Sequence, residues 1–383
     1  MVIKKNNYSA KDIEVLEGLA PVRKRPGMYI GGTDVTAYHH LANEIIDNSM
    51  DEVVAGEASE ISVILNKNKS LTIFDNGRGI PIDKHPKKNK TALEVVMTTL
   101  HSGGKFKEDG AYTTSAGLHG VGLSVVNALS SKMKVEVFKK KKIFFQDYSR
   151  GIPLNKLTQK GSAPITSGTR ITFLPDDEIF GKELKFEPHK IYETCKNKAF
   201  LFKGVKVNWE CDKSLLNRKD TTPGKETLFY SNGLEEFLNI ELENAKKIHD
   251  KVCFLKGDFD DKKGKVELVI QWHDNKNNFT KSFANTVPTA NGGTHESGFK
   301  SGIAKALRKF AKSKNNKIVS KASQDDIFNN ASYVVSIFVN NPEFEGQTKN
   351  KLSSAFVLKY CDQSVSTLFE DWLNRNAKAA KLI

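Results

Sequence analysis

The 383-residue sequence contains few cysteines and no long apolar run, and each absence excludes a class of protein. Its four cysteines are widely separated and form no CxxC pair or cluster with histidine. This spacing argues against a zinc site and a disulfide framework, and it fits a reducing compartment. No apolar run approaches the roughly 20 residues that span a bilayer, and the N-terminal MVIKKNNYSAKD lacks a signal-peptide core. We therefore expect a cytoplasmic protein with no membrane partner.

Basic residues outnumber acidic ones by 59 to 45, which gives a formal net charge of +14. An excess of this size indicates a polyanionic partner, most commonly nucleic acid. A lysine-rich composition without such a partner gives the same charge, so the number alone leaves both interpretations open.

The length of the chain exceeds what one hydrophobic core usually organises, so we expect two domains. Residues 1–12 are polar and predict an N-terminal arm that becomes ordered only against another surface. The turn-rich stretch KSLLNRKDTTPGKETLFYSNG separates a first domain, 13–220, from a second domain, 221–383.

The stretch from His39 to Val54, HHLANEIIDNSMDEVV, predicts a helix with one apolar and one polar face. Glu44, on the polar face, is a carboxylate able to take a proton from water, and Asn48 offers an amide oxygen to a hard cation such as Mg²⁺. A solvated surface face has the same pattern, so this stretch alone does not establish a site. The same face carries Asp47 and Asp51, which we assign to structural pairing, with the basic VRKR segment as the candidate partner.

Alternating apolar and polar residues predict two β-hairpins. The first turns at 66–69 and places Asp75 at the end of its second strand, and the second turns at 139–142. GTRITFLP predicts a further strand, which contains Thr169. In the first domain we also expect a short helix from Ile13, a helix over 190–202 and a strand in VKVNWEC. In the second we expect strands at 265–272 and 279–284, a helix capped by Thr294, a strand in YVVSIFVN and a terminal helix from Asp362.

From His85 to about Gly120 the sequence is rich in Lys, Gly, Ser and Thr, apart from the helical run TALEVVMTTLHS, which predicts a lid or a disordered segment. The segment ends in GLHGVGLSVVNALS, where Gly117, Gly120 and Gly122 open an apolar helix. Free N–H groups at a helix N-terminus attract phosphate. The order G-x-x-G-x-G is neither the dinucleotide nor the P-loop pattern, and a tight loop needing positive φ explains the same glycines.

These motifs occur together, and their combination resembles the ATPase domain of the GHKL superfamily. The resemblance is strongest to the ATPase subunits of bacterial type IIA topoisomerases, namely DNA gyrase B and the B-type subunit of topoisomerase IV. It covers essentially the whole chain through VRKRPGMYIG, IIDNSMDE, DNGRGIP, LHSGGKF, GLHGVGLSVVNALS, GGTH and QTK. It implies an α+β fold, in which a GHKL (Bergerat) α/β sandwich with a mixed sheet and helices on one face precedes a smaller transducer domain containing a βαβ unit.

The resemblance implies ATP and Mg²⁺ as cofactors and assigns roles to several residues. Glu44 matches the general base that activates water for attack on the γ-phosphate, and His40 matches the histidine that supports it. Asn48 would hold Mg²⁺. Asp75 would accept a hydrogen bond from the amino group of adenine, where guanine presents an oxygen.

Further matches surround the nucleotide. Gly79 and Thr169 fit the adenine-side floor, and Tyr112 fits the aromatic residue of the lid. The triphosphate would be surrounded by Lys105 and the backbone of Gly117, Leu118, His119, Gly120, Val121 and Gly122. Tyr8 matches an arm tyrosine that reaches the nucleotide site of the other subunit, and Gln347 and Lys349 match a second-domain pair that contacts the γ-phosphate. Apart from the resemblance, Tyr8 is typical of a tail residue and Lys349 of a solvated loop.

The activity implied is that of an ATP-operated clamp. ATP would close a homodimer through its N-terminal arms around double-stranded DNA, and hydrolysis would reset it. A basic stretch from Lys300 to Lys321 would face the DNA, although a solvated helix face has the same composition. In the full-length protein the family works with a DNA-cleaving A-type subunit, through a metal-binding region whose acidic motif is absent here, so we expect no DNA cleavage by this chain alone.

Within the family, SRG after Tyr148 and the segment GGTHESG favour topoisomerase IV over gyrase. A mismatch-repair or chaperone ATPase is disfavoured by QTK and GGTH, and a non-catalytic basic DNA-binding module remains the alternative from another class. Three segments depart from the family pattern: Lys139 replaces a common arginine at the adenine rim, Ala116 replaces a glycine, and 328–330 read Phe-Asn-Asn in place of Arg-Glu-Gly.

Overall fold

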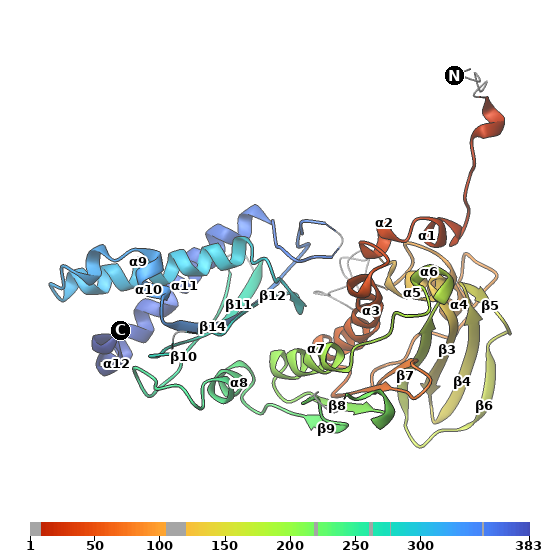
Figure 1. The fold of residues 1–383 in the computed structure, drawn as a ribbon, viewed down its shortest axis with the longest axis horizontal. Coiled ribbons are helices and arrows are strands. Elements are labelled where there is room, and N and C mark those ends of the chain that lie inside the picture. Colours follow the sequence, from red (N-terminus) through yellow and green to blue (C-terminus); the bar gives the residue numbers. More distant parts are fainter. Residues whose placement is uncertain (1–8, 105–119, 218–220, 260–262, 276, 347) are drawn as a thin grey trace.

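The computed structural model describes residues 9–104, 120–217, 221–259, 263–275, 277–346 and 348–383. These residues form two β-sheets, each with its own helices (Figure 1). The four cysteines are buried free thiols. Among the described helices, none is both long enough and apolar enough to cross a membrane.

The described chain before residue 35 has only short helical segments joined by irregular backbone. It contains a 3₁₀ turn, Ala10–Asp12, and two short helices, α1 (Ala20–Lys24) and α2 (Gly27–Ile30). The helix predicted from Ile13 is wrong, because Ile13 has extended backbone angles and Gly18 takes a left-handed φ of 62°. Helix formation starts only at α1, whose first turn accommodates Pro21.

Helix α3 (Val35–Val54) confirms the predicted amphipathic helix and begins four residues earlier. Asp34 caps it, accepting a hydrogen bond of 2.9 Å from the N–H of Ala37. Its apolar face packs on the first sheet, so that Leu41, Ile45 and Met50 are at most 1% exposed. The opposite face is thereby held against the cavity described below.

The first sheet is mixed, which confirms the predicted fold class. Within the described residues its order is β5-β4-β3-β7-β2-β1-β8-β9, with β6 paired to β4; β1 and β8 are parallel and the other pairs are antiparallel. The strands are β1 (Glu60–Leu65), β2 (Leu71–Asp75), β3 (Ser130–Lys139), β4 (Lys142–Ser149), β5 (Ile152–Pro153), β6 (Thr158–Ser162), β7 (Ser167–Pro175), β8 (Lys206–Cys211) and β9 (Lys225–Leu228). Both predicted hairpins are confirmed, as β1–β2 and β3–β4.

Helices cover one face of this sheet (Figure 1). Along β1, buried positions alternate with partly exposed ones, as expected for a sheet with a single covered face. Besides α3, the helices of this part are α4 (Ala92–Thr98), α5 (Gly122–Ala128), α6 (Asp177–Phe180) and α7 (Pro188–Leu201).

The second sheet has the order β10-β11-β14-β12-β13. Its strands are β10 (Cys253–Asp258), β11 (Gly264–Trp272), β12 (Thr280–Ala284), β13 (Val287–Pro288) and β14 (Ala331–Val339). The parallel pair β12–β14 is joined through α9 (Thr294–Ser313), which confirms the predicted βαβ unit. The remaining helices are α8 (Leu234–Glu241), α10 (Gln324–Phe328), α11 (Ala355–Arg375) and α12 (Ala377–Leu382), with 3₁₀ turns at Lys213–Leu215 and Val319–Lys321.

Helices α9 and α11 lie on one face of the second sheet and α8 lies on the other (Figure 1). Every residue of β14 is consequently buried, which fits a sequence that is apolar apart from Ser332 and Ser336. Two details of the prediction are wrong. Gly293, not Thr294, is the N-cap of α9, and the terminal helix begins at Ala355, before the predicted Asp362.

Aromatic residues join the two parts of the molecule. Phe200 of α7 stacks on Phe237 of α8, with 3.7 Å between ring centroids, and meets Phe283 of β12 edge-on at 5.7 Å. The division at 220 stays a prediction. Because β9 pairs with β8, we propose that the first unit continues to Leu228.

We expect Phe200→Ala to lower the free energy of unfolding by about 3–5 kcal/mol, because it removes a fully buried ring from this junction. Urea denaturation measures the change. Phe229→Ala is the control, because that ring is 46% exposed and its removal should change stability by about 0.5 kcal/mol or less. Equal losses in the two variants would contradict this account of the junction.

Candidate functional site

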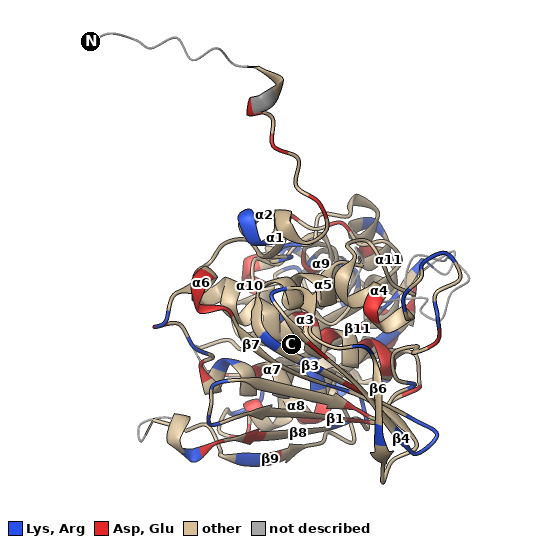
Figure 2. Cartoon of the chain, turned by 90° about the vertical axis from the view of Figure 1, so that its right-hand side faces the viewer, with Lys and Arg blue, Asp and Glu red and all other residues tan. Residues whose placement is uncertain are grey.

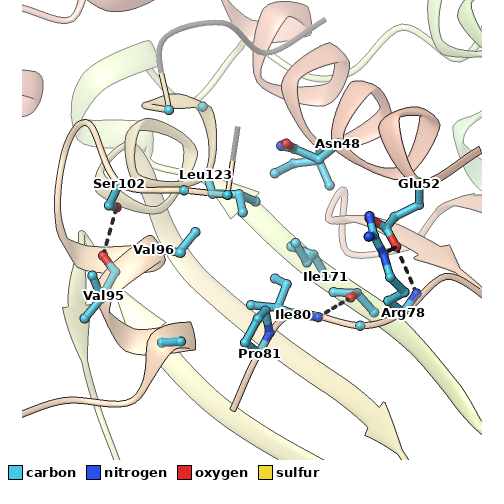
Figure 3. A pocket seen from close by; sticks show the side chains of 18 of the residues that line it. Asn48, Glu52, Arg78, Ile80, Pro81, Val95, Val96, Ser102, Leu123 and Ile171 are labelled. Atoms are coloured by element: carbon cyan, nitrogen blue, oxygen red, sulfur yellow. Dashed lines mark hydrogen bonds and ion pairs between the residues drawn. The ribbon is translucent and has the colours of Figure 1, made fainter. Parts of the chain in front are cut away.

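A cavity of about 760 Å³ lies between α3, α4, α5 and the strands β2 and β7 (Figure 3). Its volume falls within the range of small-molecule sites. Apolar side chains line much of it: Ile45, Ile73, Ile80, Pro81, Val95, Val96, Leu123 and Ile171. Polar and charged side chains line the rest of it, Asp75, Glu44 and Asn48 among them.

Glu44 is approached by side chains from both parts of the molecule. Its Oε1 atom lies 3.4 Å from His40 Nε2 and 3.7 Å from the ammonium of Lys349, which follows β14. Burial lowers the pKa of His40, and the opposing charge of Glu44 does not reverse the shift, so the imidazole is neutral near pH 7. The structure therefore brings together His40, Glu44 and Lys349, three residues that the sequence analysis had connected through a resemblance.

The start of α5 lies directly against the Glu44 carboxylate. A Cβ atom on Gly122 would lie 2.2 Å from Glu44 Oε2, so any side chain there would displace the carboxylate. Gly120 has a left-handed φ of 61°, and its carbonyl accepts a hydrogen bond of 3.1 Å from the N–H of Ser102. Val121 is the N-cap of α5. This part of the predicted glycine segment thus reaches the helix face that carries Glu44.

Asn48 points from α3 into the cavity (Figure 3). Its Nδ2 donates a hydrogen bond of 2.7 Å to the backbone carbonyl of Glu44. This bond fixes the amide plane and assigns the carbonyl end of the side chain to the role of acceptor. An amide oxygen held in this way suits a hard cation.

Asp75 lies at the end of β2 and is 5% exposed. Its carboxylate accepts hydrogen bonds of 3.0 Å each from the hydroxyl of Ser49 and the N–H of Gly77. Burial is the largest effect on its acidity and raises the pKa to about 7, although both hydrogen bonds oppose the shift. Asp75 therefore exchanges a proton close to neutral pH.

The floor beside Asp75 depends on a close approach of β2 and β7. Thr169 is the register partner of Asp75, and its hydroxyl accepts a hydrogen bond of 3.3 Å from the N–H of Ile80. Gly79 has a φ of 74°, and a Cβ there would lie 2.8 Å from the carbonyl oxygen of Gly168. A Cβ on Gly168 would lie 2.4 Å from the carbonyl oxygen of Asp75. Glycine is required at both positions for the strands and the DNGRGIP loop to meet.

The sequence did not reveal a partly buried ion pair in the wall of the cavity. Glu52 accepts hydrogen bonds from the backbone N–H, Nε and NH2 of Arg78, at 2.9, 3.1 and 2.8 Å (Figure 3). The signal was the position of Glu52 two turns beyond Glu44, on the helix that faces DNGRGIP. Lys139, the departure at the rim, also lines the cavity.

The expected pairing of Asp47 with the VRKR segment is wrong, and that of Asp51 stays a prediction. Asp47 forms an ion pair of 2.5 Å with Lys198, whereas Arg23 contacts Asp176 and Glu178. Seven predicted site residues lie outside the described residues: Tyr8, Lys105, Tyr112, Gly117, Leu118, His119 and Gln347.

We expect the side-chain carboxyl of Asp75 to titrate with a midpoint of about 7 in carbon-detected NMR spectra. Ser49→Ala should raise this midpoint, because it removes a hydrogen bond to the ionised form. Asp212 is an internal control, because hydrogen bonds from Ser214 hold its pKa below the ordinary value.

The same shift has a consequence for stability. Because the folded-state pKa is raised, the stabilisation is complete below the unfolded value of about 3.9 and is lost as the pH rises through about 7. The free energy of unfolding of the wild type, relative to Asp75→Asn, should therefore fall between pH 5 and pH 8. A midpoint for Asp75 near 4, or a difference that does not change with pH, would contradict the burial argument.

Comparisons with known proteins agree with this geometry. A family model described as DNA gyrase B matches residues 233–383, and one described as histidine kinase-, DNA gyrase B- and HSP90-like ATPase matches residues 33–179. The B-type subunit of topoisomerase 4 from Rickettsia bellii is 46% identical over 98% of this chain and 56% of its own length. The DNA gyrase B of Chlamydia pneumoniae is 39% identical over 99% of this chain and 47% of its own. The chain thus spans about half the length of these relatives.

Two solved structures are similar along nearly their whole length. The 43K ATPase domain of Thermus thermophilus gyrase B, solved with an aminocoumarin, has a TM-score of 0.77 and 38% identity, covering 95% of this chain and 92% of that one. The topoisomerase IV ATP-binding domain of Francisella tularensis, solved with a small-molecule inhibitor, has a TM-score of 0.75 and 32% identity, covering 96% and 95%. On the strength of its sequence, its two sheets and the cavity under α3, the chain belongs to the family formed by the ATPase regions of gyrase B and of the B-type subunit of topoisomerase IV.

Proposed function

We propose that this chain binds ATP in the cavity beneath α3 and hydrolyses it. The observation that carries the proposal is the Glu44 carboxylate, which lies against His40, Lys349 and Gly122 at a cavity that Asp75 also lines. Glu44 is the base in this proposal: its carboxylate accepts a proton from the water that attacks the γ-phosphate. The neutral imidazole of His40, whose Nε2 lies 3.4 Å from the carboxylate, supports the base in this proposal.

Asp75 and Thr169 are proposed to recognise adenine. The ionised carboxylate of Asp75 accepts a hydrogen bond from the exocyclic amino group, and Thr169 and Gly79 supply the polar edge of an otherwise apolar floor. Guanine presents a carbonyl oxygen at that position, which would leave two acceptors facing each other. The site therefore favours ATP over GTP.

The donor set around Asn48 is compatible with Mg²⁺. One oriented amide oxygen is insufficient by itself, but Mg²⁺ in nucleotide sites usually takes one or two protein ligands and completes its shell with phosphates and water. When bound, the ion would neutralise phosphate charge. The residue that we propose to hold it is Asn48.

Lys349 is proposed to report the γ-phosphate to the second sheet. It is 7% exposed, and its ammonium lies near Glu44 even though its backbone belongs to the loop after β14. In this proposal the ammonium also contacts the γ-phosphate of bound ATP. Hydrolysis would remove that contact and so release the second sheet. The roles of Tyr8, Lys105, Tyr112, Gly117, Leu118, His119 and Gln347 stay predictions.

For the full-length protein we propose an ATP-operated homodimer that captures double-stranded DNA and acts with an A-type subunit. Basic and acidic residues are interspersed over the end of the molecule seen in Figure 2, so the net charge of +14 does not mark that end as a DNA surface. Within the basic stretch from Lys300 to Lys321, Lys305 and Lys309 of α9 pair with Asp362 and Glu370 of α11. The exposed lysines from Lys312 to Lys321 are better placed to meet phosphate.

We propose that the full-length protein is the B-type subunit of a topoisomerase IV. The supporting observation is the higher identity to relatives bearing that name, 45–47% against 39% for a gyrase B. The alternative, a basic DNA-binding module without catalysis, predicts no ATP turnover.

Glu44→Ala should lower ATP turnover by about 10²- to 10⁴-fold, because it removes the proposed base. A phosphate-release assay measures the rate, with Glu57→Ala, an exposed acid just beyond α3, as the matched control. Turnover absent from the wild type, or equal in the wild type and Glu44→Ala, would refute the proposed mechanism.

Binding of a non-hydrolysable ATP analogue should weaken as the pH falls below about 7, because protonation of Asp75 removes the acceptor for adenine. Calorimetry between pH 6 and pH 8 tests this. Asp75→Asn keeps an oxygen acceptor without a titrating proton, so its affinity should change less over the same range. Parallel pH profiles for wild type and variant would argue against the adenine contact.

A further inference from the structure

Lys198 is a buried cation that the proposed mechanism does not use. It lies on α7, and its side chain is 3% exposed. Lysine is almost never this buried unless its charge is compensated. Its ammonium contacts Asp47 Oδ1 at 2.5 Å, the backbone carbonyl of Thr286 at 2.7 Å and the hydroxyl of Thr286 at 3.2 Å.

The first partner, Asp47, belongs to the helix that carries the proposed base. It is three residues after Glu44 and one residue before Asn48, and neither Asp47 nor Lys198 is among the residues that line the cavity. A displacement of the Asp47 side chain therefore moves the helix backbone that positions Glu44 and Asn48. Asp47 can have this effect although it does not line the cavity.

The second partner, Thr286, belongs to the turn between β12 and β13. Asn285 and Thr286 have left-handed φ angles of 46° and 71° and are at most 2% exposed. This conformation is costly for a β-branched residue and persists only where surrounding contacts enforce it. Here Asn285 supplies them: its N–H donates to the Ile337 carbonyl at 2.9 Å, and its side chain donates to and accepts from the backbone of Val339 at 2.9 and 2.8 Å.

The turn is thus fixed to β14, the strand that leads into the loop carrying Lys349. The second sheet consequently reaches α3 at two points: at Glu44 through Lys349, and at Asp47 through Thr286 and Lys198. Lys196 lies on the same helix as Lys198 but has a different ion-pair partner. It joins α7 to Glu241 of α8 at 2.7 Å, and that ion pair does not include α3.

We propose that Lys198 is a positioning residue that ties the β12–β13 turn to α3, so that the placement of the second sheet sets the placement of Glu44. This inference rests on the proposed ATP hydrolysis. While Lys349 senses the phosphate, Lys198 fixes the distance between the second sheet and the helix that holds the base. A shift of about 1 Å at a catalytic group is enough to cost about 10²-fold in rate.

The test compares Lys198→Met, the double variant Asp47→Asn/Lys198→Met, and the matched control Lys196→Met. The single variant leaves Asp47 without its cation and should be destabilised, whereas the double variant removes both charges and should recover the thermal unfolding temperature. We expect the double variant to retain a kcat for ATP about tenfold or more below wild type. Its affinity for a non-hydrolysable ATP analogue should stay within about threefold, because neither residue touches the cavity. Lys196→Met should retain wild-type kcat.

Recovery of kcat together with stability in the double variant would show that Lys198 is structural only and would overturn the proposal. An equal loss of kcat in Lys196→Met would also overturn it. If the wild type has no turnover, the proposed hydrolysis fails. Amide hydrogen exchange then tests separately whether Lys198 links the β12–β13 turn to α3. In that case, faster exchange at 44–51 of the double variant than of the wild type supports the tie, and unchanged exchange refutes it.

Discussion

The placement of the Glu44 carboxylate is the constraint on which the rest of the structure depends. Three elements remote from one another in sequence meet at this group: His40 from its own helix, Gly122 from the start of α5 and Lys349 from the loop after β14. The first sheet holds α3 by its apolar face, and the second sheet delivers the lysine. The site is therefore a product of both sheets and of the buried junction between them.

Local pattern predicted a large part of this architecture. The two faces of α3, both hairpins of the first sheet and the strand that contains Thr169 follow from periodicity, because a residue pattern repeats at the spacing of the element that it forms. The resemblance supplied the roles of Glu44 and Asp75, and the structure places both on one cavity. The largely apolar sequence of β14 predicted a strand, but not that helices would cover both of its faces.

Two of the failures concern side chains whose partners are distant in sequence, and the others are local. Asp47 was assigned to the nearby basic segment VRKR, yet its partner is Lys198, which is on another helix and is buried at the junction. Glu52 and Arg78 pair across the cavity wall, and neither residue reveals the other by its own pattern. At Gly18, one left-handed residue prevented the helix expected from Ile13. Strand β10 was missed because apolar Phe254 is exposed and breaks the alternation of its short sequence. Helix α8 was missed although its sequence is amphipathic.

The close contact at Gly122 also limits the direction from which water can reach Glu44. One carboxylate oxygen occupies the space that a Cβ of residue 122 would fill, and the other lies against His40 and Lys349. Protein atoms thus surround the carboxylate on several sides, and the cavity supplies the approach. In the proposed hydrolysis, a water molecule would therefore reach Glu44 from the cavity, along the same path as a ligand. Gly122 would thereby limit the line of attack, although it contributes no side chain.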